Sequence, residues 1–187
     1  LGRRFDARGI ANNEENPRQY RQMLFTTKGI GDLISGVILF DETIRQTASD
    51  GRTFVEVLAR EGVLPGIKVD RGTKPLAGAP GEQVTEGLDG LRERLAEYRK
   101  LGARFAKWRA VIAIGEDGGI PTRRGMAANA HALARYAALC QEAEIVPIVE
   151  PEVLMDGRHS LERCFEVTEA TLGTVFHALG EHGVALE

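Results

Sequence analysis

The chain has 187 residues, of which 43% are hydrophobic and 27% charged, and its 24 basic and 27 acidic side chains give a net charge of -3. This composition is typical of soluble globular proteins and excludes disordered, collagen-like and membrane-spanning chains. The charges are interspersed, so no nucleic-acid-binding face is expected. No apolar run approaches the ~18 residues of a membrane helix, and the first residues do not show the basic, apolar and small-residue pattern of a signal peptide. We therefore expect one cytoplasmic domain over residues 1–187, with no nucleic acid or membrane partner.

The cysteines and histidines predict neither a disulfide nor a metal site. Cys140 and Cys164 both lie in apolar helical patterns, so we expect reduced, buried thiols. The histidines lack the spacing of a metal-binding pair with an acidic neighbour and fall outside the predicted strands, at positions 131, 159, 177 and 182. No serine-nucleophile motif is present either. We expect no metal ion and no cofactor.

The first predicted element is a helix over about residues 16–26. Asn12 or Asn13 can cap it, and its first turn tolerates Pro17. Because helical sequence begins directly at Leu1, without a cap or tail, we expect the chain to be a segment of a longer one.

Four short apolar segments, bounded by Gly or Pro, predict strands at residues 36–42, 66–70, 105–114 and 145–154. Helical spacing of apolar residues follows each strand, at 54–62, 87–102, 130–141 and from Ser160, as N-cap, to Gly180 or Gly183. This alternation predicts a parallel sheet, because parallel strands need a crossover long enough to hold a helix. Two α/β architectures fit it: a doubly wound sheet and a segment of a (β/α)8 barrel.

Three of the predicted strands carry charged residues two positions apart, which share one face of a strand: Lys68 and Asp70, Lys107 and Arg109, Glu150 and Glu152. Charges facing helices would lose their hydration at a large cost, so we expect these six to face a shared polar interior. A doubly wound sheet is covered by helices on both faces and lacks such an interior. The pattern therefore favours the barrel, whose enzymes keep their chemistry at the C-terminal ends of the strands.

The charged pairs predict acid/base and anion-binding chemistry. Lys107, two residues from the cation Arg109, is suited to act as a nucleophile or a proton-transfer group. Arg109 can bind a phosphate or carboxylate with its planar fork. Glu150 and Glu152 are suited to be an acid/base and an ion-pair partner. Trp108, between Lys107 and Arg109, is expected to point to the opposite face and pack against helices.

Two other features are expected to be unremarkable. Locally, nothing distinguishes Arg4 from a surface charge. Gly81 and the glycines of 87–90 are expected in loops, because no strand directly precedes them as a phosphate-binding fingerprint requires.

In the segments that carry the charged strand residues, the sequence resembles class I fructose-bisphosphate aldolase, the metal-free type that forms a Schiff base with its substrate. The resemblance covers essentially all of residues 1–187 and rests on residues 13–27, 35–54, 65–78, 87–111 (which include FAKWR), 129–142 and 146–157 (VPIVEPEVLMDG). It implies a TIM barrel of which this chain supplies about the second to fifth strands. It also implies a homotetrameric glycolytic lyase that acts on a phosphorylated sugar.

The resemblance also implies a role for each matching residue. Glu150 is then the acid/base of carbinolamine formation and dehydration, Lys107 assists proton transfer and holds the substrate, and Arg109 binds a phosphate. The remaining matches are substrate-binding positions: Glu152, Lys68, Asp70 beside Lys68, and Arg4, which corresponds to an arginine that reaches a substrate phosphate.

Three departures accompany the match. The family's imine-forming lysine corresponds to a position shortly after Glu187, its first-strand aspartate to a position before Leu1, and the loop of residues 116–119 is slightly longer. Four strands alone would leave two unpaired edges, so we expect such a segment to be poorly stable by itself. Two alternatives stay open: a phosphosugar-binding module without catalysis, and a sugar-processing barrel with another substrate.

Overall fold

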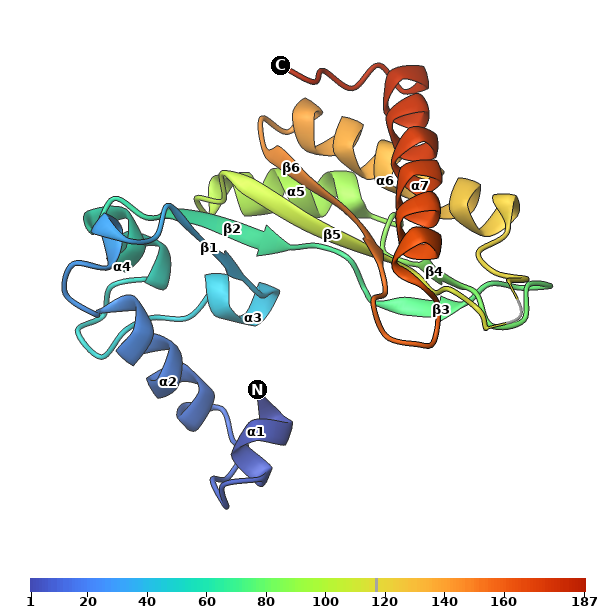
Figure 1. Ribbon diagram of the computed structural model, residues 1–187. Coiled ribbons are helices and arrows are strands. Elements are labelled where there is room, and N and C mark those ends of the chain that lie inside the picture. The colour runs from blue at the N-terminus through green and yellow to red at the C-terminus, as the bar shows by residue number, and fades with distance from the viewer. Residues whose placement is uncertain (117) are drawn as a thin grey trace.

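The structure is a computed structural model that describes residues 1–116 and 118–187. Its main sheet has four parallel strands in the order β1-β2-β5-β6: β1 (Gly36–Leu39), β2 (Leu64–Lys68), β5 (Phe105–Ile112) and β6 (Val146–Val153). The helices are α1 (Gly2–Asp6), α2 (Glu15–Phe25), η1 (Ile30–Asp32), α3 (Asp41–Ile44), α4 (Phe54–Arg60), α5 (Leu91–Lys100), α6 (Arg123–Glu142) and α7 (Leu161–Glu181). A small antiparallel hairpin, β3 (Thr73–Pro75) and β4 (Gln83–Thr85), follows β2 (Figure 1).

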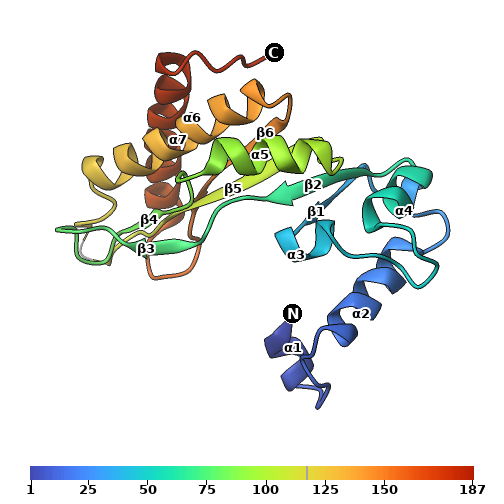
Figure 2. The same cartoon turned by 180° about the vertical axis from the view of Figure 1, so that it is seen from behind.

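The order of the strands argues against one of the two predicted architectures, the doubly wound sheet. Each strand of the main sheet pairs with the next one along the chain, apart from the separate hairpin. Right-handed crossovers that always advance in one direction place all of the connecting helices on one face of the sheet. Figures 1 and 2 show α5 and α6 on the same side of β5 and β6. A doubly wound sheet needs a reversal of strand order, which the described sheet lacks.

Burial alternates along β5, and this alternation orients the charged residues. Ala106, Trp108 and Ala110 are fully buried. The Trp108 ring packs against Tyr136 of α6 with their centroids 5.5 Å apart, which confirms the predicted orientation of Trp108. The residues between them, Lys107 and Arg109, are only half-buried on the other face.

Side-chain hydrogen bonds to backbone N–H groups lie at the start of α2 and of α7. The Asn13 side chain accepts a hydrogen bond from the Asn16 N–H at 2.8 Å, at the start of α2. The Ser160 side chain accepts one from the Arg163 N–H, as predicted for the N-cap of α7. This last helix ends just before Gly183, whose positive φ of 65° is the backbone conformation that favours glycine.

Several predicted boundaries are wrong. The strand predicted at 36–42 ends at Leu39, and Asp41 opens α3, because acidic side chains suit the positive end of a helix. The strand predicted at 66–70 runs from Leu64 to Lys68, so Asp70 lies beyond it. The helix predicted at 130–141 begins earlier, at Arg123, because the Thr122 side chain caps it. The predicted longer loop at 116–119 includes residue 117, which lies outside the described residues.

Both cysteines are free thiols, but they differ in burial. Cys140 is fully buried, and this burial raises its thiol pKa to about 12. Cys164 is only half-buried, which corrects the prediction that both are buried. Within the described part of the chain, no helix is both long and apolar enough to cross a membrane.

The capping box of α4 provides a test of local stability. The Thr53 side chain accepts a hydrogen bond from the Glu56 N–H at 3.1 Å, and the Glu56 carboxylate accepts one from the Thr53 N–H at 2.7 Å. We expect Thr53→Ala to lower the free energy of unfolding by about 1 kcal/mol, because it leaves a helix N–H without its cap. Thr53→Ser keeps the hydroxyl and is the control. Urea unfolding of the complete gene product that contains these residues measures both, and equal values for the two variants would contradict the prediction.

Candidate active site

Two cation–carboxylate pairs join β5 to β6 on the half-exposed face. The Lys107 ammonium contacts the Glu150 carboxylate, and the Arg109 guanidinium contacts the Glu152 carboxylate. The strand register places Arg109 directly beside Glu150, so each cation reaches a carboxylate further along the next strand. The prediction that these four charges share one face is confirmed.

Lys68 and Asp70 extend this cluster onto β2. Lys68 lies beside Lys107 in the register of the sheet, and its ammonium contacts the Asp70 carboxylate. Asp70 lies past the end of β2, so the two do not meet through strand alternation as predicted. Instead, the Asp70 carboxylate accepts a hydrogen bond from the Gly72 N–H at 3.1 Å, the side-chain-to-backbone contact of an Asx turn.

The cluster is open to a ligand. The side chains of Lys107 and Arg109 are 23% and 42% exposed, and those of Glu150 and Glu152 are 32% and 38% exposed. Solvent therefore reaches all four groups, and so can a small polar molecule. The Asp70 side chain differs because it is only 3% exposed, which suits a residue that orients its neighbours.

The pairs determine the electrostatics of the cluster. Hydrogen bonding from Arg109 holds the pKa of the Glu152 carboxyl below its ordinary range, and Lys107 adds a smaller effect in the same direction. The same contact with Glu152 raises the pKa of Arg109. The ion-pair partner of Lys107 is the Glu150 carboxylate on the next strand.

Arg4 is not brought to this cluster. It is exposed on α1, which lies well apart from β5 and β6 in both ribbon views (Figures 1 and 2). Phe5 of α1 packs edge-on against Tyr20 of α2, with ring centroids 6.0 Å apart. The position of α1 therefore follows α2 and not the main sheet, and no local pattern in the sequence indicates this.

The hairpin and α6 supply residues next to Arg109 that the sequence did not predict. The Thr85 hydroxyl, at the end of β4, donates a hydrogen bond to the Arg109 carbonyl oxygen at 2.7 Å. Asn129 of α6 is 2% exposed and bonds to the backbone of β4. The runs at 73–75 and 83–85 flank a segment rich in Gly and Pro, which is a hairpin signal, but three-residue strands are too short to show alternation. Turns at Gly81 and Gly90, both with positive φ, agree with the predicted loops.

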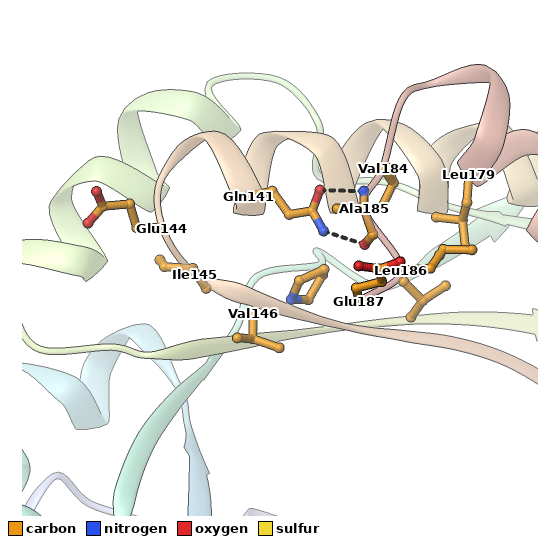
Figure 3. A pocket seen from close by; sticks show the side chains of 11 residues that line it. Gln141, Glu144, Ile145, Val146, Leu179, Val184, Ala185, Leu186 and Glu187 are labelled. Atoms are coloured by element: carbon orange, nitrogen blue, oxygen red, sulfur yellow. Dashed lines mark hydrogen bonds between the residues drawn. The ribbon is translucent and has the colours of Figure 1, made fainter.

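Two pockets differ in what they offer chemically. One of about 380 Å³ includes Lys68 and Asp70 together with Arg94 and Tyr98 of α5. Another, of about 510 Å³, lies at the start of β6 and is lined mainly by apolar side chains (Figure 3). Its one glutamine, Gln141, is already bonded to the Ala185 backbone in both directions. Of these two pockets, the first is the one that shares residues, Lys68 and Asp70, with the charged cluster.

No group of three or more His, Cys, Asp or Glu side chains within the described residues is arranged to hold a metal ion.

The family model described as class I fructose-bisphosphate aldolase matches residues 1–187. The chain belongs to this family. A relative from Xanthomonas campestris pv. campestris, named as a probable class 1 fructose-bisphosphate aldolase, is 64% identical over the whole chain. A relative from Spinacia oleracea, named as the cytoplasmic isozyme of fructose-bisphosphate aldolase, is 51% identical, also over the whole chain.

A solved structure of the Plasmodium falciparum fructose-bisphosphate aldolase superimposes with a TM-score of 0.95 over 98% of this chain, at 50% identity. The parallel α/β arrangement of the aldolase family is therefore present here. The chain spans about half the length of these proteins: 55% of the Xanthomonas relative, 52% of the Spinacia relative and 53% of the Plasmodium structure.

The Arg109–Glu152 contact provides a test by titration. Because the pKa of Glu152 is lowered in the folded chain, the pair stabilises the fold above the ordinary value of 4.5 and loses this contribution as the pH falls. We expect Arg109→Gln to raise the pKa of Glu152 toward that ordinary value. Carboxyl carbon NMR of glutamate-labelled protein measures it, with Glu152→Gln to assign the resonance and Arg163→Gln as a distant control. An unchanged titration would show that Arg109 is not the cause.

Proposed function

We propose that this chain forms part of a class I fructose-bisphosphate aldolase. The reaction is the reversible cleavage of fructose 1,6-bisphosphate into dihydroxyacetone phosphate and glyceraldehyde 3-phosphate through a lysine Schiff base, in glycolysis and gluconeogenesis. The observation that carries the proposal is the pairing of Lys107 with Glu150 and Arg109 with Glu152, at one open face of a chain that belongs to this family.

Glu150 is proposed as the acid/base. The amine of the imine-forming lysine adds to the substrate ketone and gives a carbinolamine. A proton from the Glu150 carboxyl then converts the carbinolamine hydroxyl into a leaving water molecule. The carboxylate that remains takes a proton back from water in the reverse direction. Lys107 contacts this carboxylate, so its ammonium is placed to relay the proton and to hold a substrate oxygen.

Arg109 is proposed to bind a phosphate of the substrate, because its planar guanidinium can donate two parallel hydrogen bonds to phosphate oxygens. Glu152, Lys68 and Asp70 are proposed to bind and orient the substrate around it, since all three lie in the same charged cluster. Arg4 stays a proposed phosphate ligand on the resemblance alone, because α1 holds it away from the cluster.

The remaining proposals concern the whole protein. Strands β1, β2, β5 and β6 are proposed as about the second to fifth strands of a TIM barrel, in a single domain that includes residues 1–187. The imine-forming lysine and the family's first-strand aspartate are proposed to lie in the part of the relatives' length that this chain does not cover. A cytoplasmic homotetramer is proposed, and the Spinacia relative is named as a cytoplasmic isozyme.

A second candidate is a phosphosugar-binding module without catalysis. It is favoured by one observation, that the cations of Lys68, Lys107 and Arg109 lie in one charged cluster where an anionic ligand can bind. Such a module would bind the sugar phosphates through the same cluster but would leave them chemically unchanged.

Borohydride trapping separates the two candidates. We expect the complete gene product, incubated with dihydroxyacetone phosphate and then reduced, to gain the mass of one reduced imine per chain, because borohydride fixes the Schiff base covalently. Protein treated with borohydride before the ligand is the control and should gain nothing. Intact mass and peptide mapping are the measurements. No adduct would contradict Schiff-base catalysis, and an adduct on Lys107 or Lys68 would move the imine to this chain.

Two substitutions test the proposed roles. We expect Glu150→Gln to lower kcat about 10²- to 10⁴-fold while ligand affinity changes little, because the amide cannot transfer the proton. We expect Arg109→Ala to weaken binding of the bisphosphate by about 10- to 100-fold, because charge-assisted hydrogen bonds are lost.

Steady-state kinetics and ligand titration of both variants measure these effects. A module that only binds would respond to the arginine change and ignore the glutamate change. If neither variant differs from the parent protein in binding or turnover, the assignment of the site is wrong.

A further inference from the structure

The backbone of Arg109 lacks a strand partner on one side. Strand β2 ends at Lys68, whereas β5 continues to Ile112. The last backbone bond between the two segments runs from the Val69 N–H to the Lys107 carbonyl oxygen, at 3.1 Å. Two residues further along β5, the N–H and C=O of Arg109 point toward the same side, where no strand follows within the described sheet.

Two side chains replace the missing strand at Arg109. The Thr85 hydroxyl donates to the Arg109 carbonyl oxygen at 2.7 Å, and an Asp70 carboxylate oxygen lies 3.5 Å from the Arg109 nitrogen. The shorter contact comes from Thr85, whose residue is 3% exposed, so water does not compete freely for this carbonyl.

Thr85 is itself held by buried groups of α6. The Asn129 side-chain oxygen accepts from the Thr85 N–H at 3.4 Å, and its amide nitrogen donates to the Gln83 carbonyl at 2.8 Å. The amide thus pairs with the edge of β4 as a neighbouring strand would. Next to it, the buried Glu82 carboxylate accepts from the N–H and the hydroxyl of Thr122, at 2.8 and 2.6 Å. These contacts anchor β4 to the start of α6.

We propose that Thr85, held in place by Asn129, is a positioning residue for Arg109. The inference rests on the proposed role of Arg109 as a phosphate ligand. The hydroxyl fixes the carbonyl of Arg109 and so the direction in which the guanidinium leaves β5. Thr85 acts through Arg109 and needs no contact with the substrate.

Replacing the hydroxyl by a methyl group tests the proposal. In the complete gene product, we expect Thr85→Val to raise KM for fructose 1,6-bisphosphate about 3- to 10-fold, with kcat within about twofold of the parent, because one hydrogen bond that orients Arg109 is lost. Thr85→Ser keeps the hydroxyl and should restore the parent KM. Thr171→Val is the matched control, because Thr171 is an equally buried threonine on α7, with its hydroxyl against Met126 of α6.

A double-mutant cycle decides whether Thr85 acts through Arg109. In an Arg109→Ala background, Thr85→Val should have no further effect on KM, because the guanidinium that it positions is gone. An equal effect of Thr85→Val with and without Arg109 would overturn the proposal, and so would a KM for Thr85→Val that matches that of Thr171→Val.

Amide hydrogen exchange gives a readout that needs no turnover. We expect the peptide covering residues 105–112 to exchange faster in Thr85→Val than in Thr85→Ser or Thr171→Val, because the carbonyl that the hydroxyl restrains is released. If the parent protein lacks aldolase activity, the proposed function fails. The exchange data then still decide on Thr85: faster exchange supports the restraint on Arg109, and unchanged exchange overturns it.

Discussion

Trp108 is buried between β5 and the helices, and its burial orients the charged face of the sheet. An aromatic side chain buries about 150–250 Å², which at about 25 cal/mol per Å² contributes roughly 4–6 kcal/mol. Partly exposed ion pairs such as Lys107–Glu150 contribute about 0–1 kcal/mol. Burial of Trp108 is therefore the larger effect. Because side chains alternate along a strand, it directs Lys107 and Arg109 to the opposite face whatever their partners are.

The register of β6 follows from the same kind of constraint. Arg109 lies beside Glu150, which places both glutamates of β6 on the face of the cations. A shift of one residue would turn Glu150 and Glu152 toward the helices, where unpaired carboxylates lose their hydration at a large cost. The charges therefore do little to hold the strands together, yet they exclude a register shifted by one residue. The register that buries the apolar face of β6 is thus the same register that brings Glu150 and Glu152 to the cations of β5.

Much of this arrangement is predictable from the sequence, and its limits have physical causes. The strands at 105–112 and 146–153 agree with prediction to within two residues, because Gly and Pro bound them and charges alternate with apolar side chains. The predicted end of β1 is wrong because an acidic residue, Asp41, favours the first turn of a helix. The hydrogen bonds from Thr85 to Arg109 and to Asn129 join residues 24 and 44 positions apart, so no local pattern indicates them.

The contact between Arg109 and Glu152 makes the glutamate a tethered competitor for any anion that enters the site. A monovalent carboxylate offers the guanidinium little more than it already has, and it must also arrive from dilute solution. A phosphate dianion brings more charge and a third oxygen acceptor, so it can displace the glutamate side chain with a net gain. In the proposed role of Arg109 as a phosphate ligand, this ion pair would favour phosphorylated ligands over simple carboxylates. Discrimination between anions would then arise from Glu152, a residue that the bound ligand displaces.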